Sequence, residues 1–229
     1  SLGFPKEDLH KLGFAGLMLD IGKMKLPEEL LSRHGRYTRG EFMLMKTHVQ
    51  HSLDILNQMD NVSMDVFDMV ARHHERHDGS GYPYGLKAEW IGIFGSMAGI
   101  VDCFTAITSD RPYSQAKSPH DTLQLLYKWS DRVFHPVLVE QFAQCVGVFP
   151  IGTLVELSSG DIGIVVGQNY TRRLKPRVMV ILGPDQQPHA RPMLLDLITD
   201  PPGPNNQPII VRRTLPRDSF GIDPREYFL

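Results

Sequence analysis

The sequence has few cysteines and lacks long apolar runs. Cys103 and Cys145 are the only two cysteines in 229 residues, and they form no recognisable spacing. A disulfide framework is therefore excluded, and a reducing compartment such as the cytoplasm is expected. No apolar run approaches the ~20 residues that a membrane-spanning helix needs, and no signal-peptide pattern opens the chain. The sequence thus predicts a cytoplasmic protein without a membrane segment.

The sequence also lacks an excess of charge of one sign, because its formal net charge is -2. Without a global basic field, any anionic ligand must be held by a local cluster. One basic cluster comprises Arg172, Arg173, Lys175 and Arg177. Such clusters are commonly solvated, and Tyr170 alone stands nearby as an aromatic platform for bases. Nucleic-acid binding is therefore not expected.

The composition is that of a globular protein, with 41% hydrophobic and 22% charged residues. The length suffices for one sizeable domain and a small one. The chain begins abruptly at Ser1 rather than at a methionine. We interpret it as a fragment of a longer protein, so the question whether residues upstream supply further ligands stays open.

Up to about residue 144 the apolar residues recur at helical spacing. Glu7 and Asp8 suit the positive end of a first helix. The pattern predicts a mainly α fold, a helical bundle with helices over 5–19, 38–56, 64–73, 90–106, 119–129 and 136–145. Gly79 to Pro83 is predicted to be a loop, because its two glycines and proline favour a turn.

The residue pattern changes at Phe149-Pro150, where β-branched residues begin to alternate around turn signals. This part predicts strands over 153–157, 163–166 and 177–182, with a possible fourth over 208–211. We therefore expect two domains, a helical domain over 1–148 and a small β-rich C-terminal module over 149–229.

Five residues with metal-binding side chains are dispersed along the helical part: Asp20, His48, His73, His74 and Asp102. Each lies on or at the end of a predicted helix, and in a helical bundle such side chains can converge on metal ions. Imidazole and carboxylate ligands without a thiolate suit iron, manganese or zinc. A lone histidine on a helix is more often packed or solvated than a ligand. Adjacent His73 and His74 point about 100° apart in a helix, so both reach one ion only where the helix ends.

The sequence motifs around these residues resemble those of the HD-GYP family. Members of this family are bacterial phosphodiesterases that cleave the signalling dinucleotide cyclic di-GMP. The resemblance rests on Asp20 to Lys23, on His48, on the segment 73–86 with the sequence HHERHDGSGYPYGL, on Asp102, and on 109–113. It runs from about residue 3 to 144 and implies an HD-type helical bundle. A weaker resemblance, with no chemistry attached, links 149–182 to the β-rich tail of some members.

The resemblance also implies roles for single residues. Asp20 would bridge two metal ions, His48, His73 and His74 would complete the ligands of one, and Asp102 would bind the neighbouring one. The metal is expected to be iron or manganese.

Two basic residues take their roles from the same resemblance. Lys23 would meet the scissile phosphate, where an ammonium stabilises the charge of the transferring group. Arg111 would contact a guanine or a phosphate through its planar fork of donors. Without the motif, either residue alone would be read as a solvated surface charge.

The sequence departs from the family's pattern at several positions. The signature pair His-Asp is Leu19-Asp20 here, and a leucine cannot be a metal ligand. Thr105 stands where some members have a further acidic ligand, Ser96 where an arginine is common, and Ser114 where a basic residue is frequent. The family's upstream helix with another histidine is absent, and His10 lies too close to Asp20 to replace it. We therefore expect one tightly held metal ion and a weak second one.

Two functions from different classes follow from these residues. The first is hydrolysis of cyclic di-GMP, to the linear dinucleotide or to GMP, either at full rate or, as the damaged site favours, weakly or not at all. The second is a regulatory module that senses cyclic di-GMP or docks a partner such as a diguanylate cyclase domain. Tyr82 is expected to contact the ligand, and Gly81, Tyr82 and Pro83 to form the docking loop, although glycines and a proline can also simply shape a turn.

Overall fold

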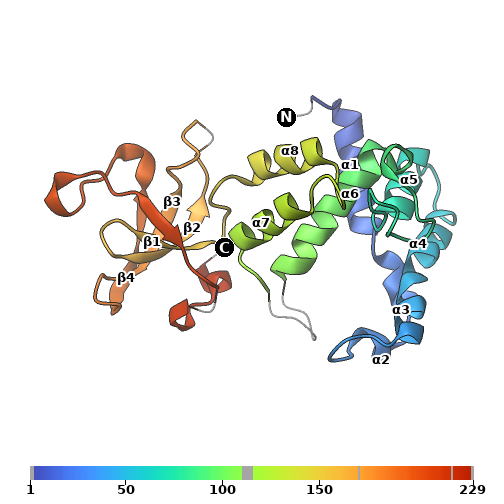
Figure 1. The fold of residues 1–229 in the computed structure, drawn as a ribbon, viewed down its shortest axis with the longest axis horizontal. Coiled ribbons are helices and arrows are strands. Elements are labelled where there is room, and N and C mark those ends of the chain that lie inside the picture. Colours follow the sequence, from blue (N-terminus) through green and yellow to red (C-terminus); the bar gives the residue numbers. More distant parts are fainter. Residues whose placement is uncertain (1–2, 110–115, 170, 218, 228–229) are drawn as a thin grey trace. The chain divides into compact units, whose positions relative to one another are not determined.

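The computed structural model (Figure 1) describes residues 3–109, 116–169, 171–217 and 219–227. These residues form two compact units. The first, helical unit comprises 1–115 and 125–142, and the second contains the β-sheet and comprises 116–124 and 143–229.

The predicted helices are present, with altered bounds. Along the chain they are α1 (Lys6–Met18), η1 (Ile21–Lys25, a 3-10 helix), α2 (Glu28–Leu31), α3 (Arg39–Lys46), α4 (His48–Leu56), α5 (Met64–Arg72), α6 (Ala88–Thr108), α7 (Pro119–Trp129) and α8 (Pro136–Val146). In the first unit α5 packs against α1, α4 and α6, and η1 packs against α4. Because these contacts bring η1 and the ends of α4 and α5 together, they also position the candidate site.

The stretch predicted as one helix over 38–56 is two helices in the structure. A capping box starts α3, because the Thr38 side chain accepts from the Glu41 backbone and the Glu41 carboxylate accepts from the Thr38 backbone. The break falls at Thr47, whose hydroxyl donates to the Leu44 carbonyl over 2.7 Å. Hydroxyl side chains that bond the backbone in this way compete with the helical ladder. The break places His48 at the first position of α4.

The core of the helical unit is apolar and includes Leu19. Leu19 is 7% exposed and belongs to a cluster with Ala15, Leu56, Val70 and others. This stripe follows from the helical spacing of the apolar residues in α1, α4 and α5. Residue 19 is thus part of the apolar core at the point where α1 ends.

The length of α6 bears on the prediction that no apolar segment is long enough to span a membrane. By length and composition this 21-residue helix could cross a membrane. The core helix of a globular protein passes the same test, and Ile91, Ala98 and Ile100 of α6 are buried in the structure. Gly92 has a φ of +75°, a conformation that glycine adopts without strain, and it kinks the helix.

The second unit contains a five-stranded sheet in the order β4-β3-β2-β1-β5. All neighbouring pairs are antiparallel. The strands are β1 (Leu154–Leu157), β2 (Ile162–Gly167), β3 (Arg177–Leu182), β4 (Pro188–Asp196) and β5 (Val211–Thr214). Short 3-10 turns complete it: η2 (Leu197–Thr199), η3 (Pro204–Asn206), η4 (Ser219–Gly221) and η5 (Pro224–Tyr227). The expected order, a helical part followed by a β-rich C-terminal part, is confirmed.

Two strands were not predicted correctly. β4 is an edge strand that contains Pro188 and Pro192, and an edge tolerates prolines that a central strand would not. Its side chains are mostly exposed, so no apolar alternation marks it. The possible fourth strand over 208–211 had the wrong bounds. In the structure β5 begins only at Val211 and ends at Thr214, and its Arg213 pairs with Glu156 of β1.

Candidate metal centre

Asp20 lies in the short segment that joins α1 to η1. η1 sits directly on α4: the Gly22 amide donates to the Ser52 hydroxyl over 2.8 Å, and this hydroxyl donates to the Leu19 carbonyl over 3.1 Å. These two bonds anchor the backbone on both sides of Asp20. The carboxylate is thereby carried to the N-terminal end of α4, where His48 stands.

Gly22 allows this close approach. A Cβ on residue 22 would lie 2.1 Å from the His48 carbonyl oxygen and 2.4 Å from the Ser52 amide nitrogen. Both atoms belong to the backbone of α4 and cannot turn away. A larger residue therefore has to push η1, and Asp20 with it, off the helix.

We expect Gly22→Ala to lower the free energy of unfolding by about 3 kcal/mol, the upper range for overpacking a tight contact. Gly13→Ala is the matched control, because nothing lies within 4 Å of a Cβ there. Alanine in that exposed helix interior should raise stability by up to about 1 kcal/mol. Urea unfolding of both variants checks this, and equal behaviour would show that η1 does not depend on the contact.

His48 and His73 are each oriented by the backbone carbonyl three residues earlier, which belongs to α3 for His48 and to α5 for His73. His48 Nδ1 lies 2.6 Å from the Met45 carbonyl oxygen, and His73 Nδ1 lies 2.7 Å from the Val70 carbonyl oxygen. A carbonyl oxygen only accepts, so Nδ1 carries the hydrogen in both rings. Each Nε2 therefore presents a lone pair, as a metal ligand requires.

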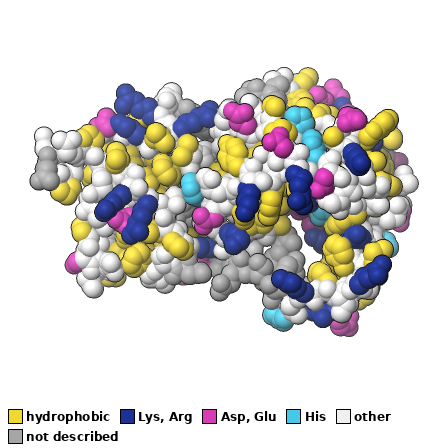
Figure 2. Space-filling view, in the orientation of Figure 1, with side chains coloured by type: hydrophobic (Ala, Val, Ile, Leu, Met, Phe, Trp, Pro, Cys, Tyr) yellow, Lys and Arg dark blue, Asp and Glu magenta, His cyan; other side chains and the backbone are white. Residues whose placement is uncertain are grey.

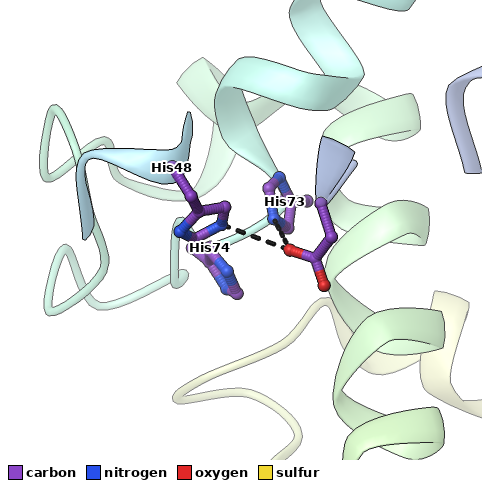
Figure 3. Close-up of side chains that lie close together, drawn as sticks. His48, His73 and His74 are labelled. Carbon is purple, nitrogen blue, oxygen red and sulfur yellow. Dashed lines mark ion pairs between the residues drawn. The ribbon is translucent and has the colours of Figure 1, made fainter. Parts of the chain in front are cut away.

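Four side chains converge from these elements: Asp20, His48, His73 and His74. One ligand atom from each lies within 4.8 Å of the others. The distances are 3.3 Å from His48 Nε2 and 3.9 Å from His73 Nε2 to Asp20 Oδ1. Figure 3 shows the three imidazoles grouped closely, with His73 and His74 at the end of their helix. The expectation that a helix end lets both reach one point agrees with this geometry, since α5 ends at Arg72.

Three of these ligand atoms lack the partners that buried polar atoms normally have. Asp20 Oδ1, His48 Nε2 and His73 Nε2 are inaccessible to solvent and accept or donate no hydrogen bond among the described residues. His48 and His73 are almost completely buried. Buried polar atoms without partners are costly unless an ion or a water satisfies them. The donor set of one carboxylate and three imidazoles fits a divalent transition metal.

The protonation states of these side chains also favour the binding of a metal ion. Burial lowers the pKa of His73 to about 4. Burial and the neighbouring His73 and His48 lower the pKa of His74 well below its ordinary value. Burial on its own would raise the pKa of Asp20, but the His48 imidazole and the Lys23 ammonium outweigh it and lower that pKa. At neutral pH His73 and His74 are therefore neutral imidazoles and Asp20 is a carboxylate, the forms that bind metal.

The lowered pKa of His73 predicts an acid-sensitive metal-free protein. In the unfolded chain His73 takes up a proton near pH 6.5, whereas in the fold it resists protonation until about pH 4. Stability is thus lost as the pH falls from 6.5 to 4, by up to about 3 kcal/mol. Urea unfolding in the presence of a chelator measures the loss. His73→Asn, whose amide can still donate to the Val70 carbonyl, should flatten this part of the profile; an unchanged slope would contradict the assignment.

Lys23 and Asp102 lie beside the cluster. Lys23 Nζ is 2.5 Å from Asp20 Oδ2, the oxygen that does not face His48. Asp102 Oδ2 is 3.6 Å from His74 Nδ1, so Asp102 approaches the cluster through His74. The role predicted for Asp102, as ligand of a neighbouring ion, stays a prediction. Arg111 and Ser114 lie outside the described residues.

The loop after His74 is held by a buried carboxylate that the sequence reading did not single out. Glu75 is 3% exposed, and its two oxygens accept from the Tyr84 amide over 2.7 Å and the Leu86 amide over 2.8 Å. A Cβ on Gly81 would lie 2.5 Å from the His74 carbonyl oxygen, so the loop rests on the backbone next to the histidines. The signal available in the sequence was an acidic residue directly after the histidine pair.

This attachment turns Tyr82 toward the metal cluster. Its ring centroid is 4.6 Å from that of His74 with an interplanar angle of 31°. Pro83 and Tyr84 are exposed instead, Tyr84 by 59%. Of the three predicted docking residues, Pro83 is thus the one that faces solvent, and the docking role stays a prediction.

The residues that depart from the family pattern differ in their exposure to solvent. Leu19 is buried in the apolar core, Ser96 is 8% exposed, and Thr105 and His10 are exposed. His10 is thus a solvent-facing residue of α1 and is not part of the cluster.

The basic residues of the C-terminal part are partly neutralised. Lys175 pairs with Asp200, and Arg172 Nη1 lies 3.7 Å from the same carboxylate. On the face drawn in Figure 2, Lys and Arg side chains are interspersed with acidic and apolar ones. Tyr170 lies outside the described residues. This arrangement gives no support to a nucleic-acid interface.

The fold and the cluster together define a helical metal-binding domain. Residues 1–137 match the family model described as "HD domain", and the chain belongs to this family, in its HD-GYP branch.

Three relatives are similar to 60–78% of this chain. The protein named cyclic di-GMP phosphodiesterase PA4108 of Pseudomonas aeruginosa is 38% identical over 179 residues, which cover 78% of this chain and 43% of that protein. The cyclic di-GMP phosphodiesterase response regulator RpfG of Xanthomonas campestris is 35% identical over 61% of this chain and 37% of its own length. The 3'3'-cGAMP-specific phosphodiesterase 2 of Vibrio cholerae is 32% identical over 60% of this chain and 27% of its own length. The chain thus spans less than half the length of these relatives.

Proposed function

We propose that this chain is the metal-dependent domain of a cyclic di-GMP signalling protein, with one metal ion held tightly and with weak or absent hydrolysis. The observation that carries the proposal is the contrast between two neighbouring residues. Asp20 lies within reach of three imidazoles, and its Oδ1 and the Nε2 atoms of His48 and His73 are buried without a hydrogen-bond partner among the described residues, whereas Leu19 is buried in the apolar core. The names of the relatives support cyclic di-GMP as the ligand.

A divalent ion at this cluster supplies Lewis-acid catalysis of phosphodiester hydrolysis, and efficient sites use a pair of ions. Iron or manganese suits the carboxylate and imidazole donors. Lys23 lies at the edge of the cluster, where its ammonium can stabilise negative charge that develops on a phosphate. Tyr82 packs its ring on that of His74 and so helps to fix the orientation of this imidazole. Water would add its oxygen to phosphorus, the bond to one ribose oxygen would break, and a proton from the water would end on that ribose oxygen, which gives the linear dinucleotide with a terminal phosphate and a free hydroxyl.

Leu19→His tests the proposed defect. The metal-free variant should lose about 3 kcal/mol of stability, because an imidazole replaces a buried leucine. If residue 19 is the missing ligand, the variant should also bind more metal per chain and cleave cyclic di-GMP faster. Leu19→Gln is the control, with the same loss of stability and no gain. A Leu19→His variant that gains neither metal nor turnover would show that Leu19 is not the defect.

The alternative of full activity is decided by the same assay. Turnover of cyclic di-GMP by the metal-loaded chain at rates of about 1 s⁻¹ or more, an ordinary enzyme rate, would favour an undamaged phosphodiesterase. An assay with 3'3'-cGAMP in parallel decides between the two substrates in the names of the relatives. Cys103 and Cys145 form no disulfide among the described residues, which agrees with the proposed cytoplasmic location.

A second candidate function is the docking of a diguanylate cyclase domain through the loop 81–83. The observation that favours it is the exposure of Pro83 and the adjacent Tyr84 on a loop that Glu75 holds in one shape. Pro83→Ala with Tyr84→Ala should then abolish co-elution with such a domain in size-exclusion chromatography. Co-elution that persists in the double variant would exclude this loop.

A further inference from the structure

A cation and two aromatic rings meet beside the metal cluster. Lys46 Nζ lies 4.7 Å from the ring centroid of Phe42 and 4.9 Å from that of Tyr82. The two rings are 6.0 Å apart and nearly perpendicular, at 82°. Phe42 and Lys46 stand one helical turn apart on α3, whereas Tyr82 comes from the loop that Glu75 holds. We call these three residues the Lys46 corner.

The Lys46 corner is joined to the cluster by direct contacts. The Tyr82 ring packs on His74 at 4.6 Å and lies 6.5 Å from the His48 ring. Lys46 is also the last residue of α3, and the break at Thr47 separates it from His48. Contacts therefore run without interruption from Lys23 through Asp20, His48 and Tyr82 to Lys46.

No carboxylate of the described residues forms an ion pair with Lys46, whereas Lys23 is bonded to Asp20. Phe42 is 43% exposed. An ammonium over aromatic faces stays available to an anion, and an exposed ring beside it can pack against a flat base.

We propose that the Lys46 corner is a second anchoring subsite for a cyclic dinucleotide, in which Lys46 binds the phosphodiester that is not cleaved. This inference rests on the proposed function, which places the cleaved phosphodiester at the metal cluster and Lys23. A cyclic dinucleotide carries a second phosphodiester and a base on each ribose. The series of contacts described above has Lys23 at one end and Lys46 at the other, so each of the two phosphates can meet one ammonium group. Phe42 supplies a surface for the base next to the second phosphate.

Calorimetric titration of the manganese-loaded chain with cyclic di-GMP tests the subsite. Lys46→Gln should weaken binding about tenfold, the effect of losing one charge-assisted hydrogen bond, and Lys46→Arg should restore most of it. Phe42→Ala should weaken binding by a factor on the order of ten, as the loss of one stacking contact does. Lys25→Gln and Met43→Ala are the controls, since they remove an exposed cation of η1 and an exposed apolar side chain of α3.

Each outcome decides the proposal. Weaker binding in Lys46→Gln and Phe42→Ala, with the two controls like the unchanged chain, supports the subsite. If Lys46→Gln binds like Lys25→Gln, the subsite is wrong while the proposed function stands. If the unchanged chain binds manganese but no cyclic dinucleotide, both the proposed function and the subsite are overturned.

Discussion

Replacing His48 by asparagine is expected to weaken manganese binding at least about a hundredfold, more than a change outside the ligand set produces. His48 Nε2 is a buried lone pair with no hydrogen-bond partner among the described residues, and it lies 3.3 Å from the Asp20 carboxylate. Asparagine can still donate to the Met45 carbonyl in place of Nδ1, but it offers no atom at the position of Nε2. The metal-free fold should therefore stay intact while the site loses a ligand.

His51→Asn is the matched control for this change. His51 lies on the same helix, three residues further along, and is not part of the cluster. Its variant should bind manganese like the unchanged chain. Isothermal calorimetry gives both affinities, and thermal unfolding with and without manganese gives the stabilisation by the ion. Equal affinities in the two variants would mean that His48 is a core histidine and not a ligand.

Replacing Glu75 by glutamine is expected to release the loop that covers His74. The carboxylate accepts from two backbone amides, and a glutamine side chain turns a donor toward one of them. Since Glu75 is buried, an amide without an acceptor should lower stability by about 2–3 kcal/mol. Chymotrypsin should then cleave after Tyr84, and cyclic di-GMP binding should fall because Tyr82 no longer packs on His74.

The control for this variant is Glu89→Gln. Glu89 is an exposed acidic residue in the first turn of α6, so the charge change is the same without the loss of a buried acceptor. It should unfold and resist chymotrypsin like the unchanged chain. If Glu75→Gln behaves like Glu89→Gln, the loop is held by its glycine contacts and not by the carboxylate.

The helical part of the fold could be predicted because apolar spacing and capping residues mark each helix. The break at Thr47 could not, since a hydroxyl that bonds the backbone is equally common on a continuous helix. Yet this break separates Lys46 from His48 and defines where α4 begins. β4 was missed for a related reason: an exposed edge strand has no buried face, so its sequence carries no alternation.

The candidate metal ligands could be found from their residue types and from the sequence motifs of the family. In the structure four of them lie close together. Spacing could not show that Asp102 approaches the cluster through His74, because the two come from different helical elements. Glu75, Phe42 and Lys46 were missed as well. A buried acceptor and an exposed cation beside rings are defined by their surroundings, and the sequence does not contain those surroundings.

The stoichiometry of bound metal tests the central claim most directly. The chain is loaded with manganese, passed over a chelating resin and analysed for metal by mass spectrometry. One retained ion per chain, lost in His48→Asn and kept in His51→Asn, is the predicted result. Two or more ions retained per chain would contradict a site in which Asp20, His48, His73 and His74 form the one strong metal pocket and Leu19 leaves its neighbour weak.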